Sequence, residues 1–384
     1  MSRFEPDAFD MFADLPTESP PSPAKSNIKN PKTEATKALA FAMGPAAATL
    51  VSTAPWVPPP DDQCFAGGTV YAPVRFVLRV SRPGLWVPTM LTFLVGLAAP
   101  LEAAASPGFW AGLFYCGWPF NTLIMGWNDM MDADIDRLNP RKIKAQKLLS
   151  GPQMKAMPLL IAATNIPFAA AAYYYLGAPK TALLLANGLG SSLAYDGVGD
   201  GWPMQWSRVP GLDVFTIVWM YLFPLHVAYA LFGVPTNGLA RLAWCGLCLA
   251  RCQAAAAHWD AEADALQGKG TVATFFGRAN CEWVMLAMWA AETLVVGETL
   301  GCFKSAVVHA TGVGAWAAIK ALSMGSNKVS AGKCAALNRL IVDQHYAIQT
   351  VTSVCTVLEL WWGSGGGGDG GAAAAHFLIE VAAA

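Results

Sequence analysis

Residues 109–127 read FWAGLFYCGWPFNTLIMGW and carry no charge, and the chain then continues as NDMMDADIDRLNPRK (128–142). At about 1.5 Å per residue, an uncharged helix of this length reaches across a hydrocarbon core of about 30 Å. Four aspartates follow within nine residues, and basic residues come after them. The change from apolar to acidic predicts a transmembrane helix that ends at a charged site on one side of the membrane.

The rest of the chain has the composition of a membrane protein. Of its 384 residues, 54% are hydrophobic and 13% are charged, whereas soluble domains carry about 25% charged residues. The apolar runs are residues 84–101, 103–128, 156–179, 181–195, 214–240, 238–259, 283–301, 305–322 and 344–362. They predict an all-α, multi-span integral membrane protein with about nine transmembrane helices around a central cavity. A net charge of −1 argues against nucleic acid as a partner.

Composition also divides the chain into three expected parts. Residues 1–74 are an N-terminal segment, disordered or with a targeting function, because residues 1–37 are rich in Pro, Ser and charged side chains. Residues 75–362 contain the apolar runs, and residues 363–384 form a Gly/Ala-rich flexible tail. For a eukaryotic source, an organelle membrane (plastid, mitochondrion or ER) is one expected location.

Basic residues favour the loops that follow even-numbered helices, counting from residue 84. The loop after the second helix contains Arg137, Arg141 and Lys142, and the loop after the sixth contains Lys269 and Arg278. The positive-inside rule places these loops on the inner side, facing the cytoplasm or the interior of an organelle. The acidic stretch that begins at residue 128 is therefore predicted to lie on the inner side.

The aspartates of this stretch have the spacing of one helical face. If the helix continues past residue 127, Asp129, Asp132 and Asp136 stack on the same side over two turns, with Asn128 at their start. Three adjacent carboxylates repel one another unless a cation lies among them. Oxygen ligands select a hard cation, and Mg²⁺ prefers a few carboxylates together with substrate phosphate oxygens. The spacing therefore predicts a Mg²⁺ site.

A second acidic pair, Asp260 and Asp264, lies in HWDAEADALQGKGTVATFFG (258–277) at the end of the sixth helix. Both clusters are predicted on the inner side, where they can face one cavity and hold two or three Mg²⁺ ions around a diphosphate. The bases expected to neutralise that diphosphate are Arg137, Arg141, Lys142, Arg208 and Lys269. The alternative is a solvated acidic helix end, and the presence of two such clusters on one side favours the metal site.

The two clusters resemble motifs of a known family. NDMMDADID is similar to the NDxxDxxxD motif of the UbiA superfamily of intramembrane prenyltransferases, and DAEADALQGKGTVATFFG resembles its second, DxxxD motif. SRPGLWVPT (81–89) resembles the family's opening segment, and the resemblance covers about residues 75–360. It implies that a Mg²⁺–diphosphate is bound by Asn128, Asp129, Asp132, Asp136, Asp260 and Asp264. It also implies that the prenyl diphosphate ionises and that a lipophilic acceptor captures the allylic cation, with Tyr195 as a candidate for stabilising it.

Two further segments, DRLNPRK (136–142) and VPGLD (209–213), resemble the branch of the family that elongates carotenoids such as lycopene. The loop at 194–213 departs from the family pattern, because Asp196 replaces the serine that usually follows the tyrosine, and Arg208 is displaced. This departure leaves the acceptor open. It also leaves open a terpene cyclase, in which the same fold cyclises a prenyl diphosphate without any acceptor.

Ionisable residues also occur inside the apolar runs, where they are costly and often functional. Glu292 is interpreted either as a contact to the acceptor or cation, or as part of a helix–helix contact. His226 also lies within a predicted span. Arg251 is interpreted as reaching the diphosphate or as extending its charged end to the membrane interface.

The leading hypothesis is a Mg²⁺-dependent prenyltransferase that acts on a prenyl diphosphate and a lipophilic acceptor among membrane lipids, with no obligate protein partner inferred. The hypothesis from another class is a transporter whose acidic clusters bind a cation. Transporters bind their substrates near the bilayer midplane. The acidic residues here are predicted at helix ends on one side, which favours the enzyme.

Overall fold

The computed structural model describes residues 72–136, 149, 151–198, 205–266, 268–324 and 328–362. All of these residues belong to one compact unit, Trp56–Ala384. Every regular element in these ranges is helical, which confirms the all-α class. The expected C-terminal tail and nearly all of the expected N-terminal segment lie outside the described residues.

The first helices begin and end at recognisable sequence signals. They are α3 (Ala72–Ser81), η1 (Pro83–Leu85), α4 (Trp86–Val95), α5 (Pro100–Ala104), α6 (Pro107–Met131) and α7 (Ala133–Asp136). Helix α6 starts where the Ser106 side chain accepts a hydrogen bond from the Gly108 N–H at 3.1 Å and Pro107 occupies the first turn. Helix α4 is shorter than the expected span at 84–101, because the chain turns after Val95 and Pro100 begins the separate helix α5.

The middle of the chain forms α9 (Gly151–Asp196), η2 (Trp206–Arg208), α10 (Leu212–Tyr221) and α11 (Phe223–Phe232). Helix α9 consists of two helices that meet at Gly177, where φ is 79° and ψ is 168°. Glycine adopts this conformation without the steric cost that a β-carbon would add. The two apolar runs expected at 156–179 and 181–195 therefore occupy the two arms of α9.

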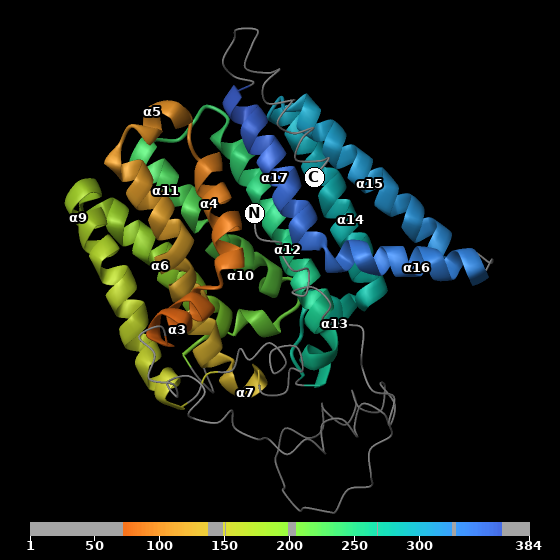
Figure 1. The fold of residues 1–384 in the computed structure, drawn as a ribbon, viewed down its shortest axis with the longest axis horizontal. Helices are drawn as coiled ribbons and strands as arrows, with labels where there is room; N and C mark the ends of the chain where they lie inside the picture. Colours follow the sequence, from red (N-terminus) through yellow and green to blue (C-terminus); the bar gives the residue numbers. More distant parts are fainter. Residues whose placement is uncertain are drawn as a thin grey trace, which may run out of the picture. The chain divides into compact units, whose positions relative to one another are not determined.

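The last part of the described chain contains α12 (Gly238–Leu266), α13 (Val272–Phe276), α14 (Arg278–Leu294), the π-helical turn η3 (Val295–Thr299), α15 (Phe303–Ser323), α16 (Lys328–Asp343) and α17 (His345–Trp362). Helix α16 is absent from the expected spans. Its sequence, KVSAGKCAALNRLIVD, contains four charged residues that interrupt the apolar pattern. Figure 1 shows that α16 lies across the direction of α15 and α17.

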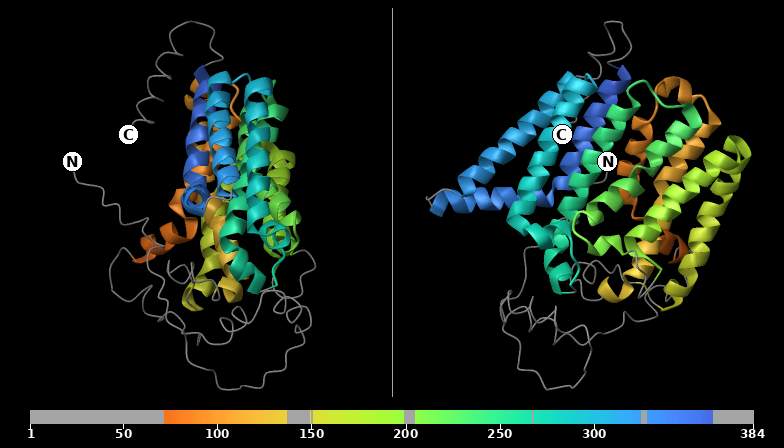
Figure 2. Two further views of the ribbon diagram at one scale, coloured as in Figure 1. Left: turned by 90° about the vertical axis from the view of Figure 1, so that its right-hand side faces the viewer. Right: turned by 180° about the vertical axis from the view of Figure 1, so that it is seen from behind.

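Most of the longer helices run side by side, as the two further views in Figure 2 show. Helix α12 packs against α14 and α10, and α6 packs against α4 and α9. The short helices α3, α7 and α13 all lie at the lower end in Figure 1. Helices α6 and α12 both have their C-termini on this side of the bundle, and these C-termini carry the acidic motifs. We call this side the acidic end.

Aromatic packing fills one half of the bundle. Phe120 of α6 stacks on Phe223 of α11, with ring centroids 4.9 Å apart and ring planes 14° apart. Phe93 of α4 is fully buried and contacts Phe109 of α6. These large side chains join α4, α6 and α11 into one apolar cluster above the acidic end.

Two helical segments in the described part combine the length and apolar composition of a membrane span, namely Gly151–Asp196 and Leu212–Phe232, the latter joining α10 and α11. Other long helices, such as α12, carry several charged residues within their bounds. The expected total of about nine spans stays a prediction.

Candidate functional site

The three aspartates of the first motif lie at the junction of α6 and α7. Asp129, Asp132 and Asp136 are each less than a tenth exposed. The prediction of one continuous helix through residue 136 is wrong in detail, because α6 ends at Met131 and Asp132 separates it from α7. The N–H of Asp132 still bonds to the carbonyl of Asn128 at 2.8 Å, so the helical path is nearly kept.

Arg82 forms an ion pair with the first of these aspartates. Its Nη2 donates to Asp129 Oδ1 at 2.5 Å, and its side chain is 22% exposed. Arg82 has φ 49° and ψ 77°, and it is the one non-glycine residue with positive φ in the described part of the chain. Such a conformation costs free energy and persists where the surroundings impose it. The turn between α3 and η1 thus brings a guanidinium to the acidic end.

Lys269 connects the two acidic motifs. Its Nζ lies 3.6 Å from Asp132 Oδ2, and its backbone N–H donates to the carbonyl of Asp264 at 2.8 Å. Burial lowers the pKa of Lys269, but the negative charges of Asp132, Asp264 and Asp196, with Tyr195, raise it above its ordinary value overall. The lysine is therefore a cation held among carboxylates from α6 and α12. The structure brings the two predicted clusters to one place.

Asn128 also takes part in this cluster. Its Nδ2 donates to Asp132 Oδ2 and to Asp196 Oδ1, each at 3.1 Å. Asp196 ends α9 and is 6% exposed. The residue that departs from the family pattern thus contacts the first motif directly.

Tyr195 lies beside the same group of charges. Lys269 Nζ is 6.0 Å from the centroid of its ring, within the range of a cation–π contact. Its hydroxyl accepts a hydrogen bond from Gln253 Nε2 of α12 at 3.4 Å. One face of the ring is therefore turned toward a positive charge, and the role of Tyr195 in stabilising an allylic cation stays a prediction.

Two loops pack against each other beside Lys269. Asp213 is fully buried and accepts hydrogen bonds from the Gly211 N–H at 2.8 Å and from the Val272 N–H at 3.1 Å. A β-carbon placed on Gly270 would lie 2.7 Å from the carbonyl oxygen of Arg208. The loop before α10, which includes Arg208, therefore supports the loop that carries Lys269.

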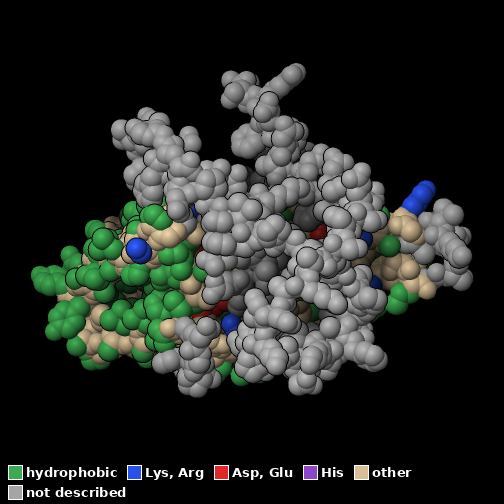
Figure 3. All heavy atoms as spheres, turned by 90° about the horizontal axis from the view of Figure 1, so that it is seen from below, with side chains coloured by type: hydrophobic (Ala, Val, Ile, Leu, Met, Phe, Trp, Pro, Cys, Tyr) green, Lys and Arg blue, Asp and Glu red, His purple; other side chains and the backbone are tan. Residues whose placement is uncertain are grey.

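The remaining predicted site residues lie partly within and partly outside the described residues. Arg137, Arg141 and Lys142 lie outside the described residues. Asp264 is 8% exposed, and Asp260 lies one turn before it on α12. Figure 3 views the acidic end directly and shows acidic side chains near the middle of this face, beside a largely hydrophobic flank.

The donor atoms at the acidic end fit a hard divalent cation. They are carboxylate and amide oxygens, which Mg²⁺ prefers. Within the described ranges, no three Asp, Glu, His or Cys side chains are close enough together to hold a metal by themselves. Mg²⁺ is usually bound through one or two carboxylates, while phosphate oxygens and water complete its coordination.

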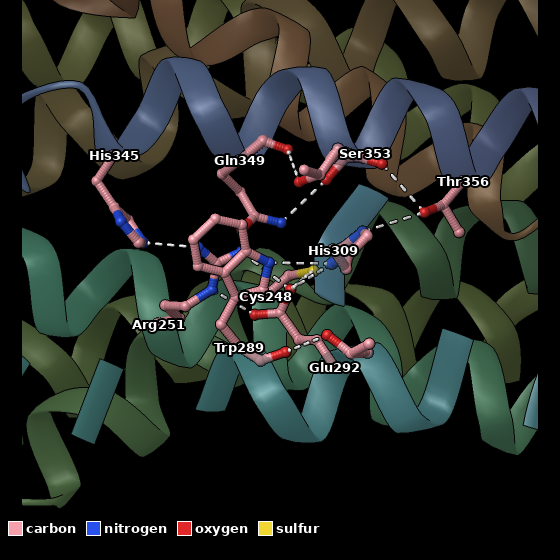
Figure 4. A network of polar contacts seen from close by, with 11 residues as sticks. Cys248, Arg251, Trp289, Glu292, His309, His345, Gln349, Ser353 and Thr356 are labelled. Atoms are coloured by element: carbon pink, nitrogen blue, oxygen red, sulfur yellow. Dashed lines mark hydrogen bonds and ion pairs between the residues drawn. The ribbon is translucent and has the colours of Figure 1, made fainter. Parts of the chain in front are cut away.

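The ionisable residues inside the bundle form a separate network on α12, α14, α15 and α17. Arg251 and Glu292 are both fully buried and paired, with Arg251 Nε 2.6 Å from Glu292 Oε1 (Figure 4). The prediction that Arg251 reaches the membrane interface or the diphosphate is therefore wrong, because a buried carboxylate neutralises it within the bundle. For Glu292, the helix–helix interpretation is confirmed. His226 of α11 contacts Asn187 of α9.

The sequence reasoning missed three residues of this end: Arg82, Asp196 as a contact of Asn128, and Asp213. Arg82 had a detectable signal, since it is a basic residue in the SRPGLWVPT segment just before an apolar run. Asp196 and Asp213 had none, because their partners lie 68 and 59 residues away in the sequence.

Comparison with known proteins agrees with this architecture. Residues 89–340 match the UbiA prenyltransferase family. The chain belongs to the UbiA prenyltransferase family, whose members are integral membrane proteins. The computed structure resembles a UbiA homolog from Archaeoglobus fulgidus solved bound to DMAPP and Mg²⁺, with a TM-score of 0.50 and 16% identity, over 74% of this chain and 98% of that one. This likeness supports the fold.

The names of the similar curated proteins refer to carotenoid biosynthesis. The C(50) beta-cyclic carotenoids biosynthesis protein LbtBC of Dietzia sp. (strain CQ4) is 27% identical over 224 residues, which cover 56% of this chain and 49% of that protein. A lycopene elongase/hydratase of Haloarcula japonica is 26% identical over 230 residues, covering 58% and 74%. This chain thus spans about half the length of the first relative. The predicted resemblance to the carotenoid branch is confirmed, whereas the organelle expectation receives no support.

Proposed function

We propose that this protein transfers a prenyl group from a prenyl diphosphate to a lipophilic acceptor within the membrane, with Mg²⁺ as cofactor. The observation that carries the proposal is Lys269, whose ammonium group lies 3.6 Å from Asp132 of the first acidic motif and also interacts electrostatically with Asp264 of the second. A cation among carboxylates from two helices marks the place where a diphosphate and its metals would be neutralised together. Family membership supports the reaction class.

The residues of the acidic end would have two roles in ionising the substrate: binding the metal and contacting the phosphate oxygens. Asp129, Asp132, Asp136, Asp260 and Asp264, with Asn128, would hold Mg²⁺. The bound metal would neutralise negative charge as the diphosphate departs. Arg82 and Lys269 would exchange their present carboxylate partners for phosphate oxygens, which are also favourable partners for guanidinium and ammonium groups.

The ring of Tyr195 would face the allylic cation after the diphosphate leaves. An aromatic face stabilises a nearby positive charge, and this ring already lies 6.0 Å from an ammonium group. Arg208 would add positive charge at the same end, and Arg137, Arg141 and Lys142 remain part of the proposal from the sequence. The apolar helices above would exclude water, which would otherwise capture the cation.

The acceptor we propose is a long apolar polyene of the carotenoid class. Two observations support it: the similarity to proteins named for lycopene elongation and C(50) carotenoid biosynthesis, and the apolar aromatic cluster above the acidic end. About nine transmembrane helices in residues 75–362, with the acidic end on the inner side, complete the proposal. The N-terminal segment 1–74 and the tail 363–384 are proposed to lie outside this catalytic domain.

The deciding experiment incubates purified protein in detergent with DMAPP, Mg²⁺ and lycopene, and omits each in turn. We expect a prenylated polyene and free diphosphate only when all three are present. A cyclic terpene formed without lycopene, tested with a longer prenyl diphosphate, would establish the cyclase alternative. Absence of diphosphate release with any acceptor, together with cation flux in liposomes, would establish the transporter alternative.

Asp132→Ala and Asp260→Ala test the metal assignment residue by residue. Each change removes one oxygen ligand, so we expect the rate to fall by about 100-fold or more while the protein stays folded. Product formation at saturating Mg²⁺ and thermal unfolding in detergent are the two measurements. Near-normal turnover of either variant would show that the residue it replaces is not a metal ligand.

A further inference from the structure

A fully buried ion pair joins α12 to α14 above the acidic end. Arg251 Nε donates to Glu292 Oε1 at 2.6 Å, and Arg251 Nη2 donates to Glu292 Oε2 at 2.9 Å. His345 of α17 accepts from Arg251 Nη1 at 2.9 Å, and the Arg251 guanidinium lies 4.7 Å from the ring centroid of Trp289. None of the side chains of Arg251, Glu292 and His345 is exposed. Figure 4 shows these groups converging between three helices.

Two further acid–base side-chain pairs connect the same two helices. His258 Nε2 lies 3.1 Å from Glu282 Oε1, and nearer the acidic end Arg278 Nη1 donates to Glu262 Oε1 at 2.7 Å. Along α12 the order of the contacts is 251, 258 and 262, and along α14 it is 292, 282 and 278. The three contacts therefore form a ladder between antiparallel helices, which we call the α12–α14 ladder.

Small residues make up the buried surface of α12 between and beside these contacts. They are Ala254, Ala255, Ala257, Ala261 and Ala263. Alanine side chains let two helices approach closely, but they present few ridges that would oppose sliding along the axis. Displacement by one turn, about 5.4 Å, would leave the Arg251 and Glu292 charges buried without partners, which is strongly unfavourable. The large side chains of α14 that pack on these alanines, Met285, Leu286 and Trp289, contribute to the axial register. The polar contacts add a large penalty for any displacement from it.

Helix α12 also carries the second acidic motif. Asp260 follows Arg251 by nine residues, about 13 Å along the helix axis, and Asp264 lies one turn further. Any change in the register of α12 therefore moves both carboxylates relative to Asp132, which follows the last residue of α6 and does not move with them. Misplacement of a reacting group by about 1 Å can cost about 100-fold in rate.

We propose that Arg251 and Glu292 are positioning residues: their ion pair holds α12 in the register that places Asp260 and Asp264 opposite the first acidic motif. The inference rests on the proposed function for its consequence in metal binding. The pair does not contact the diphosphate, because it is completely buried and Glu292 occupies both donor nitrogens of Arg251 that face it. It acts only through the helix.

The test replaces both members with apolar residues of similar size, Arg251→Met with Glu292→Leu. Removing a complete buried ion pair is often neutral or stabilising, whereas removing one member leaves an unpaired charge. We expect thermal stability in detergent at or above that of the wild type. The Mg²⁺ concentration for half-maximal binding of dimethylallyl S-thiolodiphosphate, a slowly ionising analogue, is expected to rise about tenfold or more.

The axial register of α12 against α14 is measured by cross-linking, independently of metal binding. Glu262→Cys with Arg278→Cys places two thiols at the exposed end of the α12–α14 ladder, and a short bifunctional maleimide joins them in the native register. We expect the cross-linking yield to fall when these changes are combined with R251M/E292L. The matched control is Val227→Ala, a buried position of α11 in the apolar cluster with α4 and α6. This control should lower stability without changing the Mg²⁺ response or the cross-linking.

The following results would overturn the positioning role of Arg251 and Glu292. A folded R251M/E292L protein whose Mg²⁺ response stays within about twofold of wild type, with unchanged cross-linking, would overturn it. If the double variant does not fold, Glu292→Gln takes its place, since it keeps the side-chain shape and removes the charge; a wild-type response there would also overturn the inference. A wild type that shows no Mg²⁺-dependent binding would contradict the proposed function, and cross-linking alone would then decide the register.

Discussion

Lys269 occupies the position where charge from the two acidic motifs is balanced. It lies 3.6 Å from Asp132 and beneath the ring of Tyr195, and its backbone bonds to Asp264. Arg82 balances Asp129 in the same way at the start of the motif. Two basic side chains, Arg82 and Lys269, already lie among the carboxylates. When a metal–diphosphate binds in the proposed reaction, these bases would leave their carboxylate partners and pair with phosphate oxygens.

Lys269→Met tests this role at the scale of a single residue. Methionine keeps much of the side-chain length but removes the charge, so we expect kcat/KM for the prenyl diphosphate to fall by about 100-fold or more. The measurement is steady-state product formation. Lys180→Met is the matched control, since Lys180 is an exposed lysine that donates to the Ala230 carbonyl at the opposite end. Equal loss in both variants would mean that the effect is not specific to the site.

At the scale of elements, the close approach of two loops positions Lys269. Asp213 at the start of α10 accepts a hydrogen bond from Val272 at the start of α13, so the loops before these helices are fastened together. Gly270 lies against the Arg208 carbonyl, where only a residue without a side chain fits. Helix α13 is further defined by the capping box of Thr271 and Thr274.

Gly270→Ala tests this junction. The added methyl group would lie 2.7 Å from the backbone oxygen of Arg208, and relief of such overpacking costs about 1–3 kcal/mol. We expect a lower unfolding temperature and a higher KM for the prenyl diphosphate, because the Lys269 loop must shift. Gly84→Ala is the control, since no atom lies within 4 Å of its added β-carbon. A Gly270→Ala protein with wild-type stability and KM would contradict the role of this contact.

At the scale of the whole molecule, the helices separate the charged chemistry from the apolar interior. The acidic motifs end α6 and α12 on one side, whereas the bend of α9 at Gly177 and the start of α12 at Gly238 lie at the other end (Figure 1). In the proposed reaction, the charged diphosphate would bind at the acidic end and the hydrocarbon acceptor among the apolar helices. The separation also makes the two ends distinguishable in a membrane.

Topology can be measured with single cysteines at the two ends. Lys180→Cys and Glu262→Cys place exposed thiols at opposite ends, and the positive-inside rule predicts Glu262 on the inner side. A membrane-impermeant maleimide added to intact cells should modify the cysteine at 180 and reach that at 262 only after permeabilisation. The unsubstituted protein gives the background, because its described cysteines are buried or half-buried. The reverse labelling pattern would invert the proposed orientation.

The sequence by itself determined the helical class, the location of the two acidic motifs and the family. Each of these depends on local information: the length of uncharged runs and the spacing of aspartates within a few turns. Tertiary structure alone decided which partners these residues meet. The contacts of Asn128 with Asp196, of Asp132 with Lys269 and of Arg251 with Glu292 join positions 41 to 137 residues apart. Local periodicity contains no information about such pairs, because their geometry depends on how whole helices pack.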